Sequence, residues 1–113
     1  MGYVTVKWRS DYPAFAECEI PEIQDFNVLP PFRRRGIGTL LLERAEALIA
    51  ARSPVVGIGV GLTSDYGPAQ RLYARRGYLP DGRGIAATHA AVAPGQVVRV
   101  DDDLVLYLNK AVR

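Results

Sequence analysis

The chain has 113 residues, of which 49% are hydrophobic, and its 14 Lys and Arg against 12 Asp and Glu give a formal net charge of +2. A chain of this length can bury roughly two thirds of the surface that its unfolded form exposes, so we expect a single domain over residues 1–113. One cysteine, Cys18, excludes an internal disulfide, and no apolar run is long enough to predict a signal sequence or a membrane span. The small charge gives no reason to predict nucleic-acid binding, and we expect a reducing, cytoplasmic setting.

The N-terminal half predicts two strands and then a helix. Tyr3–Trp8 is rich in β-branched and aromatic side chains, and Glu22–Leu29 is a second strand-like run that Pro30-Pro31 ends, so we expect antiparallel neighbours. A helix follows from about Gly36 to Arg52 because the apolar period changes to that of a helix. Its expected apolar face holds Ile37, Leu40, Leu41, Ala45, Leu48 and Ile49, and its polar face holds Glu43, Arg44, Glu46 and Arg52.

The C-terminal half predicts another strand and helix before a less regular region. Val55–Leu62 is apolar throughout, as expected of a strand covered on both faces and reached by a crossover connection. Its alternating glycines predict a close approach on one face, either by a packed element or by a ligand. A second helix begins at Gly67-Pro68, and Gly77 suits its C-terminal cap. Beyond it we expect a strand from Tyr78-Leu79, a turn at Pro80–Gly82, a short strand at Gln96–Val100, a solvated acidic turn at Asp101–Asp103 and a closing strand at Leu104–Leu108.

The basic turn Arg33–Gly38 joins the second strand to the first helix. Backbone N–H groups at a helix start have no intrahelical partner and carry the positive end of the macrodipole. Glycines admit a ligand close to the backbone, and arginines add bidentate forks, so a diphosphate would fit. The turn lacks the Gly-Lys-Ser/Thr of a P-loop and the spacing of G-x-G-x-x-G, which disfavours a nucleotide triphosphatase or a Rossmann dehydrogenase. Taken alone, the stretch favours a tight turn with solvated charges over an anion site.

Two motifs resemble the GCN5-related N-acetyltransferase (GNAT) superfamily. Val28–Gly38 looks like the cofactor motif of that family, whose core is Arg or Gln, two residues, Gly, one residue, then Gly or Ala. Ala69–Tyr78 is similar to its second motif, in which Leu-Tyr precedes a basic helix end and Gly-Phe or Gly-Tyr. Because both occur in the right order, the resemblance favours the anion site over the solvated turn.

The resemblance implies an α/β (α+β) fold with a mixed, mostly antiparallel central sheet flanked by helices. Members typically begin with a strand, two helices and another strand before the point where this chain starts, so we expect an N-terminally truncated form or a piece of a longer protein. The acceptor pocket would then be open, shortened or completed by another chain. Tyr66 stands where many members have Asn before the second-motif helix.

Acetyl-CoA is the acyl donor that the resemblance implies. Backbone groups of Phe26, Asn27 and Val28 would pair with the pantetheine arm like an added strand. The diphosphate would be wrapped by Arg33, Arg34, Arg35, Gly36, Ile37, Gly38 and Thr39. Parting of the strand at Glu22–Leu29 from that at Val55–Leu62 would create the slot for the arm.

Tyr73 and Glu22 are the catalytic candidates that the resemblance implies. Tyr73 would be the general acid for the leaving thiolate, or else a core aromatic residue. Glu22 would be the general base, or else an exposed charge at a strand end; Asp25 is a weaker candidate that strand alternation places on the opposite face. The sequence disfavours His89 and Cys18 as contributors because nothing in it fixes their surroundings, and we predict no metal site.

The leading hypothesis is an acetyl-CoA-dependent N-acetyltransferase that moves an acetyl group directly to a primary amine of a small molecule or peptide. The alternative is a non-catalytic acyl-CoA-binding or assembly module with an incomplete acceptor site. Nucleic-acid binding through the arginine clusters is a third, disfavoured reading, and we expect neither a nucleic-acid nor a membrane partner. A homodimer would cover an exposed strand edge and apolar surface.

Overall fold

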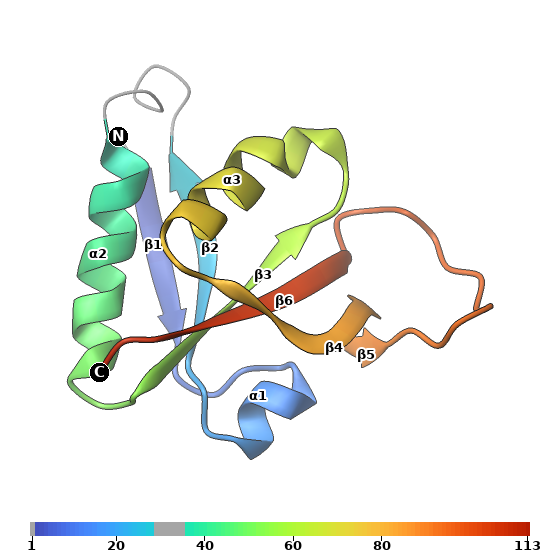
Figure 1. Cartoon of the computed structure of the whole chain (residues 1–113), viewed down its shortest axis with the longest axis horizontal. Helices are drawn as coiled ribbons and strands as arrows, with labels where there is room; N and C mark the ends of the chain where they lie inside the picture. Colours follow the sequence, from blue (N-terminus) through green and yellow to red (C-terminus); the bar gives the residue numbers. More distant parts are fainter. Residues whose placement is uncertain (1, 29–35) are drawn as a thin grey trace.

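The computed structural model describes residues 2–28 and 36–113. It has a six-stranded mixed sheet with helices on both faces (Figure 1). For residues 2, 3, 25–28 and 37 the description covers the backbone alone. The strands are β1 (Gly2–Lys7), β2 (Glu22–Val28), β3 (Val55–Gly61), β4 (Leu79–Ala87), β5 (Ala90–Ala91) and β6 (Leu104–Ala111). The helices are α1 (Pro13–Glu17), α2 (Ile37–Ala50) and α3 (Gly67–Arg75), with a short 3-10 turn, η2 (Ser64–Tyr66), before α3.

The sheet order is β1-β2-β3-β6-β4-β5. Only β2 and β3 are parallel among these neighbours, and the other pairs are antiparallel. The expected mixed, mostly antiparallel sheet is therefore confirmed. So are the antiparallel pairing of the first two strands and the crossover from β2 through α2 to β3.

Helix α2 packs on β1, β2 and β3, and the main core lies beneath it. Leu42 and Ile49 are 0% exposed, and they meet the β3 side chains of Val56 and Ile58 in one cluster. The predicted apolar face of this helix was partly wrong, because its leucines at positions 40 and 48 are 43% and 55% exposed. The buried stripe is rotated toward position 42, which the sequence pattern did not single out.

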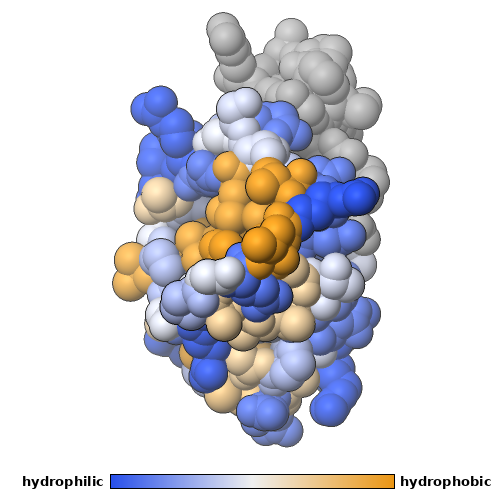
Figure 2. Space-filling model, turned by 90° about the vertical axis from the view of Figure 1, so that its right-hand side faces the viewer, coloured by the Kyte–Doolittle hydropathy of each residue, from blue (hydrophilic) through white to orange (hydrophobic). Residues whose placement is uncertain are grey.

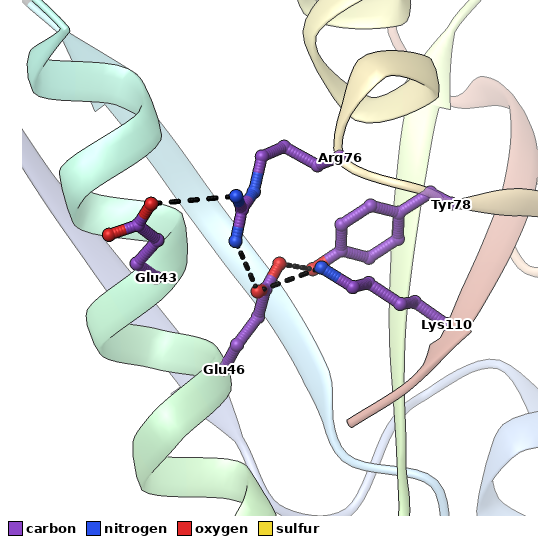
Figure 3. Close-up of polar contacts among 5 residues, drawn as sticks. All are labelled: Glu43, Glu46, Arg76, Tyr78 and Lys110. Carbon is purple, nitrogen blue, oxygen red and sulfur yellow. Dashed lines mark hydrogen bonds and ion pairs between the residues drawn. The ribbon is translucent and has the colours of Figure 1, made fainter. Parts of the chain in front are cut away.

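Glu46, predicted on the polar face of α2, is buried. Its carboxylate accepts hydrogen bonds from Arg76 Nη2 at 2.9 Å, Tyr78 OH at 2.8 Å and Lys110 Nζ at 3.0 Å (Figure 3). Burial alone would raise the pKa of Glu46, but the hydrogen bonds from Lys110, Tyr78 and Arg76 outweigh it and lower the pKa. The prediction failed because the partners come from residues distant in the sequence. The cluster joins α2 to the end of α3 and to β6.

The other face of the sheet is covered by α1 and a smaller aromatic cluster. Phe15 is 1% exposed, and the ring of Tyr12 stacks on that of Tyr107 with centroids 3.8 Å apart. A Cβ at Gly57 would lie 2.2 Å from the Phe15 ring and one at Gly61 would lie 2.3 Å from the Tyr66 ring, whereas one at Gly59 would lie 3.1 Å from Tyr107. Packed aromatic rings thus account for the alternating glycines of β3. Helix α1 was not predicted, since five residues are too few to show a helical period.

The region after Gly77 differs from two expectations. The predicted turn at Pro80–Gly82 is wrong, because β4 runs through it, with a shift of register against β6 between Pro80 and Ile85. Gly82 and Gly84 take φ values of 84° and 76°, which allow this irregularity without strain. The predicted strand at Gln96–Val100 is also wrong: the edge of the sheet is occupied by β5, and residues 96–100 belong to the loop before β6.

This loop carries exposed apolar side chains. Val97 is 95% exposed and Val100 is 66% exposed. Figure 2 shows an apolar patch, surrounded by polar residues, near the middle of the face of the molecule on which the loop projects. The valines of the expected strand therefore belong to a loop that carries exposed apolar side chains.

Candidate functional site

Strands β2 and β3 part soon after they begin. Their register pairs are Glu22 with Gly57 and Ile23 with Ile58, although β2 continues to Val28 and β3 to Gly61. The pairing of β2 with β1 extends to Val28, so the opening lies on the β3 side. The expected parting of these strands is confirmed. Backbone groups of β2 beyond the last register pair are thereby left facing a slot that an extended ligand could enter like an added strand.

A cleft of ≈ 470 Å³ lies at this opening. The cleft reaches both faces of the sheet. Its lining includes Ile58 and Val60, which belong to the main core beneath α2, and also the glycines of the opposite face of β3. Tyr73 of α3 and Glu22 of β2 both belong to its wall. The lining consists of Glu22, Ile23, Gln24, Ile58, Gly59, Val60, Gly61, Tyr66, Ala69, Tyr73, Thr88, His89, Asp102, Asp103, Val105 and Tyr107. The structure therefore brings the two predicted catalytic side chains to one cavity.

Tyr73 is held in place by the end of α3. Gly77, at φ 91°, donates its N–H to Ala74 O at 3.1 Å, and Tyr78 N–H bonds to Tyr73 O at 3.0 Å, which is the Schellman arrangement that the glycine predicted. Tyr73 is 4% exposed and belongs to the main core as well as to the cleft. Burial raises the pKa of Tyr73 to about 12, so its hydroxyl is protonated at neutral pH.

Glu22 is buried at the start of β2, with 6% exposure, so the alternative of an exposed strand-end charge is wrong. The hydroxyl of Ser10 donates to Glu22 Oε1, and Ser10 Oγ in turn accepts the N–H of Tyr12 at 3.0 Å. Among the hydrogen bonds of the described residues, Ser10 bonds to Oε1 and none reaches the other carboxylate oxygen, Oε2. Burial raises the pKa of Tyr107, and the negative charge of Glu22 adds to this rise. Glu22 thus presents one fixed and one available oxygen at the cleft.

Two turns border the cleft on the glycine side of β3. One is the β4–β5 turn at Thr88 and His89, whose φ values of 45° and 70° lie in the left-handed region that few residues other than glycine adopt. The other is the acidic turn before β6, which the sequence predicted, and Thr88 N–H joins the two by a 3.0 Å bond to Asp103 O. Tyr66 OH donates to Asp102 Oδ1 at 2.8 Å. His89, which the sequence disfavoured, therefore lies on the cleft wall.

The proposed cofactor turn is described only in part. Arg33, Arg34 and Arg35 lie outside the described residues. Gly36 precedes α2 with φ 74°, its carbonyl accepts Leu40 N–H at 3.0 Å, and, being glycine, it offers no side chain to cap the helix start. Gly38 is buried and Thr39 is half-buried. An open first turn next to the slot fits a bound anion such as a diphosphate.

The remaining candidates are placed as follows. The backbones of Phe26, Asn27 and Val28 belong to β2, while the side chains of these residues and of Asp25 lie outside the described residues, as does that of Ile37. Cys18 is exposed after α1 and is not part of the cleft lining.

Comparison with known proteins agrees with this arrangement. The family model described as an acetyltransferase (GNAT) domain matches residues 1–80, which include β1 to α3 and both motifs. The chain belongs to the GNAT acetyltransferases. The resemblance inferred from the two motifs is therefore confirmed.

A solved structure shares the GNAT fold of this chain. It is that of a protein from Desulfovibrio desulfuricans assigned to the acetyltransferases of the GNAT family, with a TM-score of 0.67 and 14% sequence identity. The match covers 99% of this chain and 61% of that one, so this chain spans about three fifths of its length. No curated protein matches the sequence.

Metal-binding groups and membrane-spanning helices were also considered for this GNAT chain. Among residues 2–28 and 36–113, no group of three or more His, Cys, Asp or Glu side chains is placed to hold a metal ion. In the same ranges, no helix has the length and apolar character needed to cross a membrane.

Proposed function

We propose that this GNAT chain transfers the acetyl group of acetyl-CoA directly to a primary amine of a small molecule or peptide. The observation that supports this most strongly is the single cleft at the opening between β2 and β3, which Glu22 and Tyr73 line together. A buried carboxylate and a buried protonated phenol on one cavity suit a reaction in which one group loses a proton and another gains one.

Acetyl-CoA would be held by backbone groups of Phe26–Val28, by the first turn of α2 over Gly36–Thr39, and by Arg33–Arg35. When bound, it supplies the acetyl group as a thioester, which an unprotonated amine can attack. The open edge of β2 and the start of α2, where the N-cap residue Gly36 has no capping side chain, suit a ligand that has an amide-bearing arm and a diphosphate.

Glu22 would take the proton of the acceptor. An amine of pKa about 10.4 is protonated at pH 7, and removing its proton costs about 4.6 kcal/mol. The nitrogen becomes more acidic as its bond to carbon forms, and Oε2 of Glu22 would then accept its proton on the cleft wall, directly or through a water. Ser10 would hold the carboxylate in position through Oε1.

Tyr73 would stabilise the leaving sulfur. With a pKa of about 12, its hydroxyl is a hydrogen-bond donor at neutral pH. Complete proton transfer to a thiolate whose acid has a pKa near 8.5 would be uphill by roughly 5 kcal/mol. We therefore assign Tyr73 a hydrogen bond to the sulfur that strengthens as negative charge develops, with the proton moving late or from solvent.

The test is transfer itself. Incubation with acetyl-CoA and a panel of primary amines should release free thiol faster than hydrolysis without amine. Glu22→Gln should lower this rate by about a hundredfold or more, whereas the exposed Glu17→Gln on α1 should leave it unchanged. Saturable binding of coenzyme A with no transfer to any amine would contradict the enzyme and favour the acyl-CoA-binding module. Binding that falls steeply with salt and ignores coenzyme A would favour a nucleic-acid ligand instead.

A further inference from the structure

We propose that Tyr107 contacts the acceptor: its hydroxyl oxygen accepts an N–H of the attacking amine while Glu22 takes the proton that the nitrogen loses. Tyr107 is then a third catalytic side chain, beside Glu22 and Tyr73. This assignment rests on the proposed function and deepens it.

The Tyr107 ring lies over β3 at the cleft. The register of the sheet pairs Tyr107 of β6 with Gly59. It pairs Glu22 of β2 with Gly57, so the side chains of Tyr107 and Glu22 are both on the glycine side of β3. A Cβ at Gly59 would be 3.1 Å from Cε1 of Tyr107 and 3.7 Å from Cζ, the carbon that bears the hydroxyl. The hydroxyl end of the ring is therefore next to the strand that borders the opening, and Tyr107 lines the same cleft as Glu22.

The hydroxyl of Tyr107 has no protein partner although the residue is only 3% exposed. Among the hydrogen bonds of the described residues none involves it, whereas the stacked Tyr12 donates its own hydroxyl to Asp81 Oδ2 at 2.8 Å. Nor is this oxygen sealed in the interior, since Arg76 Nε is the one enclosed side-chain atom without a partner in the described part of the chain. The hydroxyl is thus open to the cleft, where a ligand can satisfy it.

Three contacts hold the ring in place before any acceptor binds. It stacks on Tyr12 with centroids 3.8 Å apart and an angle of 5° between the planes. The edge of Phe15 meets it with centroids 5.3 Å apart, and the backbone at Gly59 supports it from β3. A hydroxyl on a preordered ring loses little conformational freedom when it binds a ligand.

Glu22 and Tyr107 suit the same nitrogen. Burial raises the pKa of Tyr107 and the charge of Glu22 adds to the rise, so the phenol keeps its proton at neutral pH. A neutral phenol oxygen still accepts a hydrogen bond. A primary amine attacks with its lone pair and carries two N–H groups. One gives its proton to Oε2 of Glu22 as the bond to the thioester carbon forms, and the other stays on the nitrogen, which becomes the N–H of the product amide. Tyr107 holds this second N–H and so directs the lone pair.

The two faces of the sheet divide the reaction between two tyrosines. Tyr73 belongs to the main core beneath α2, and Tyr107 belongs to the aromatic cluster on the opposite face. Both line the cleft. The leaving sulfur is therefore met from one face by Tyr73, and the incoming nitrogen from the other by Tyr107 and Glu22.

The test pairs Tyr107→Phe with Tyr12→Phe. Each variant keeps a stacked ring and loses one hydroxyl, but Tyr12 does not line the cleft. With acetyl-CoA and butylamine, kcat/KM for the amine should be at least about tenfold lower in Tyr107→Phe, because a hydrogen bond to a nitrogen that gains positive charge is lost. The KM for acetyl-CoA should not change. Tyr12→Phe should keep both constants and lower the Tm, since its hydroxyl is bonded to Asp81.

Calorimetric titration of butylamine into the coenzyme A-saturated variants separates this contact from the proposed function. The Kd should be at least about threefold higher in Tyr107→Phe than in Tyr12→Phe. That difference without acetylation of any amine by the unchanged chain would contradict the proposed function and still support the contact. Variants that are equal in both Kd and kcat/KM would overturn the contact, and acetylation of butylamine by the unchanged chain would then leave the acetyltransferase intact.

Discussion

Tyr73 and Tyr78 have neighbouring rings, with centroids 5.8 Å apart, but their hydroxyls are in different surroundings. Tyr73 lines the cleft, whereas Tyr78 donates to Glu46 in the core. We expect Tyr73→Phe to lower turnover by about a hundredfold, because it removes the donor assigned to the leaving sulfur. Affinity for coenzyme A should change little. Initial rates of thiol release and equilibrium titration of coenzyme A measure the two effects separately.

Tyr78→Phe is the matched control, since it removes a hydroxyl from an equally buried tyrosine that does not line the cleft. It should reduce the free energy of unfolding and leave the turnover of the folded protein close to that of the unchanged chain. An unchanged turnover in Tyr73→Phe would remove Tyr73 from the mechanism.

Only some residues of the candidate site could be predicted from the sequence. Glu22 and Tyr73 could be proposed because each occupies a position near a local motif. Tyr66 was noted only as a departure from the family pattern, and His89 and Asp102 had no readable role, because their place in the cleft depends on how β4, β5 and β6 fold together. Local patterns identify residues near a motif, whereas a wall built by distant loops needs the tertiary structure.

At the scale of elements, the Glu46 cluster connects α2, α3 and β6. Glu46→Ala would leave Arg76 and Lys110 without their shared carboxylate, and we expect it to lower the free energy of unfolding by about 3 kcal/mol. Glu43→Gln, at a carboxylate that is 51% exposed and 3.4 Å from Arg76, should cost less than about 1 kcal/mol. Urea denaturation at neutral pH measures both.

The pH dependence of the same cluster provides a second check. The folded-state pKa of Glu46 is lowered, so its stabilising contribution is present above its ordinary pKa of 4.5 and is lost as pH falls through the lower, folded value. Glu46→Gln should therefore flatten the loss of stability on acidification. The same acid dependence in both proteins would show that the cluster does not supply the linkage.

The helices and strands also show which features of the fold could be predicted from sequence patterns. Helix α2 was predictable because its apolar period runs over 14 residues, and the cap of α3 because Gly77 suits a left-handed position. The rotation of α2 was not predictable, since a buried Glu46 is stable only with partners brought by α3 and β6. The strand expected at Gln96–Val100 failed for a related reason, because a strand also requires a neighbour with which to pair.

For the molecule as a whole, we expect the buried tyrosines to make the protein unfold at alkaline pH. Burial raises the pKa of Tyr73 to about 12, and it raises those of Tyr78 and Tyr107 further. All three are at most 4% exposed. A tyrosine whose pKa is higher in the folded than in the unfolded state binds more protons when folded. Its stabilising contribution is thus fully present below pH 10 and is lost as pH rises from there through the folded pKa.

The size of this effect follows from linkage. Between about pH 10 and pH 12 each such tyrosine lowers the free energy of unfolding by about 1.4 kcal/mol per pH unit, and three together reach roughly 8 kcal/mol over two units. Typical domains have a free energy of unfolding of about 5 to 15 kcal/mol in total, so we expect cooperative unfolding before pH 12.

Circular dichroism and tyrosinate absorbance, recorded on one pH series, should change together. Tyr107→Phe keeps the ring that stacks on Tyr12 and should make the alkaline slope shallower by about 1.4 kcal/mol per pH unit. Tyrosinate absorbance from every tyrosine near pH 10, with the native dichroism retained, would contradict the buried hydroxyls on which the assigned role of Tyr73 depends.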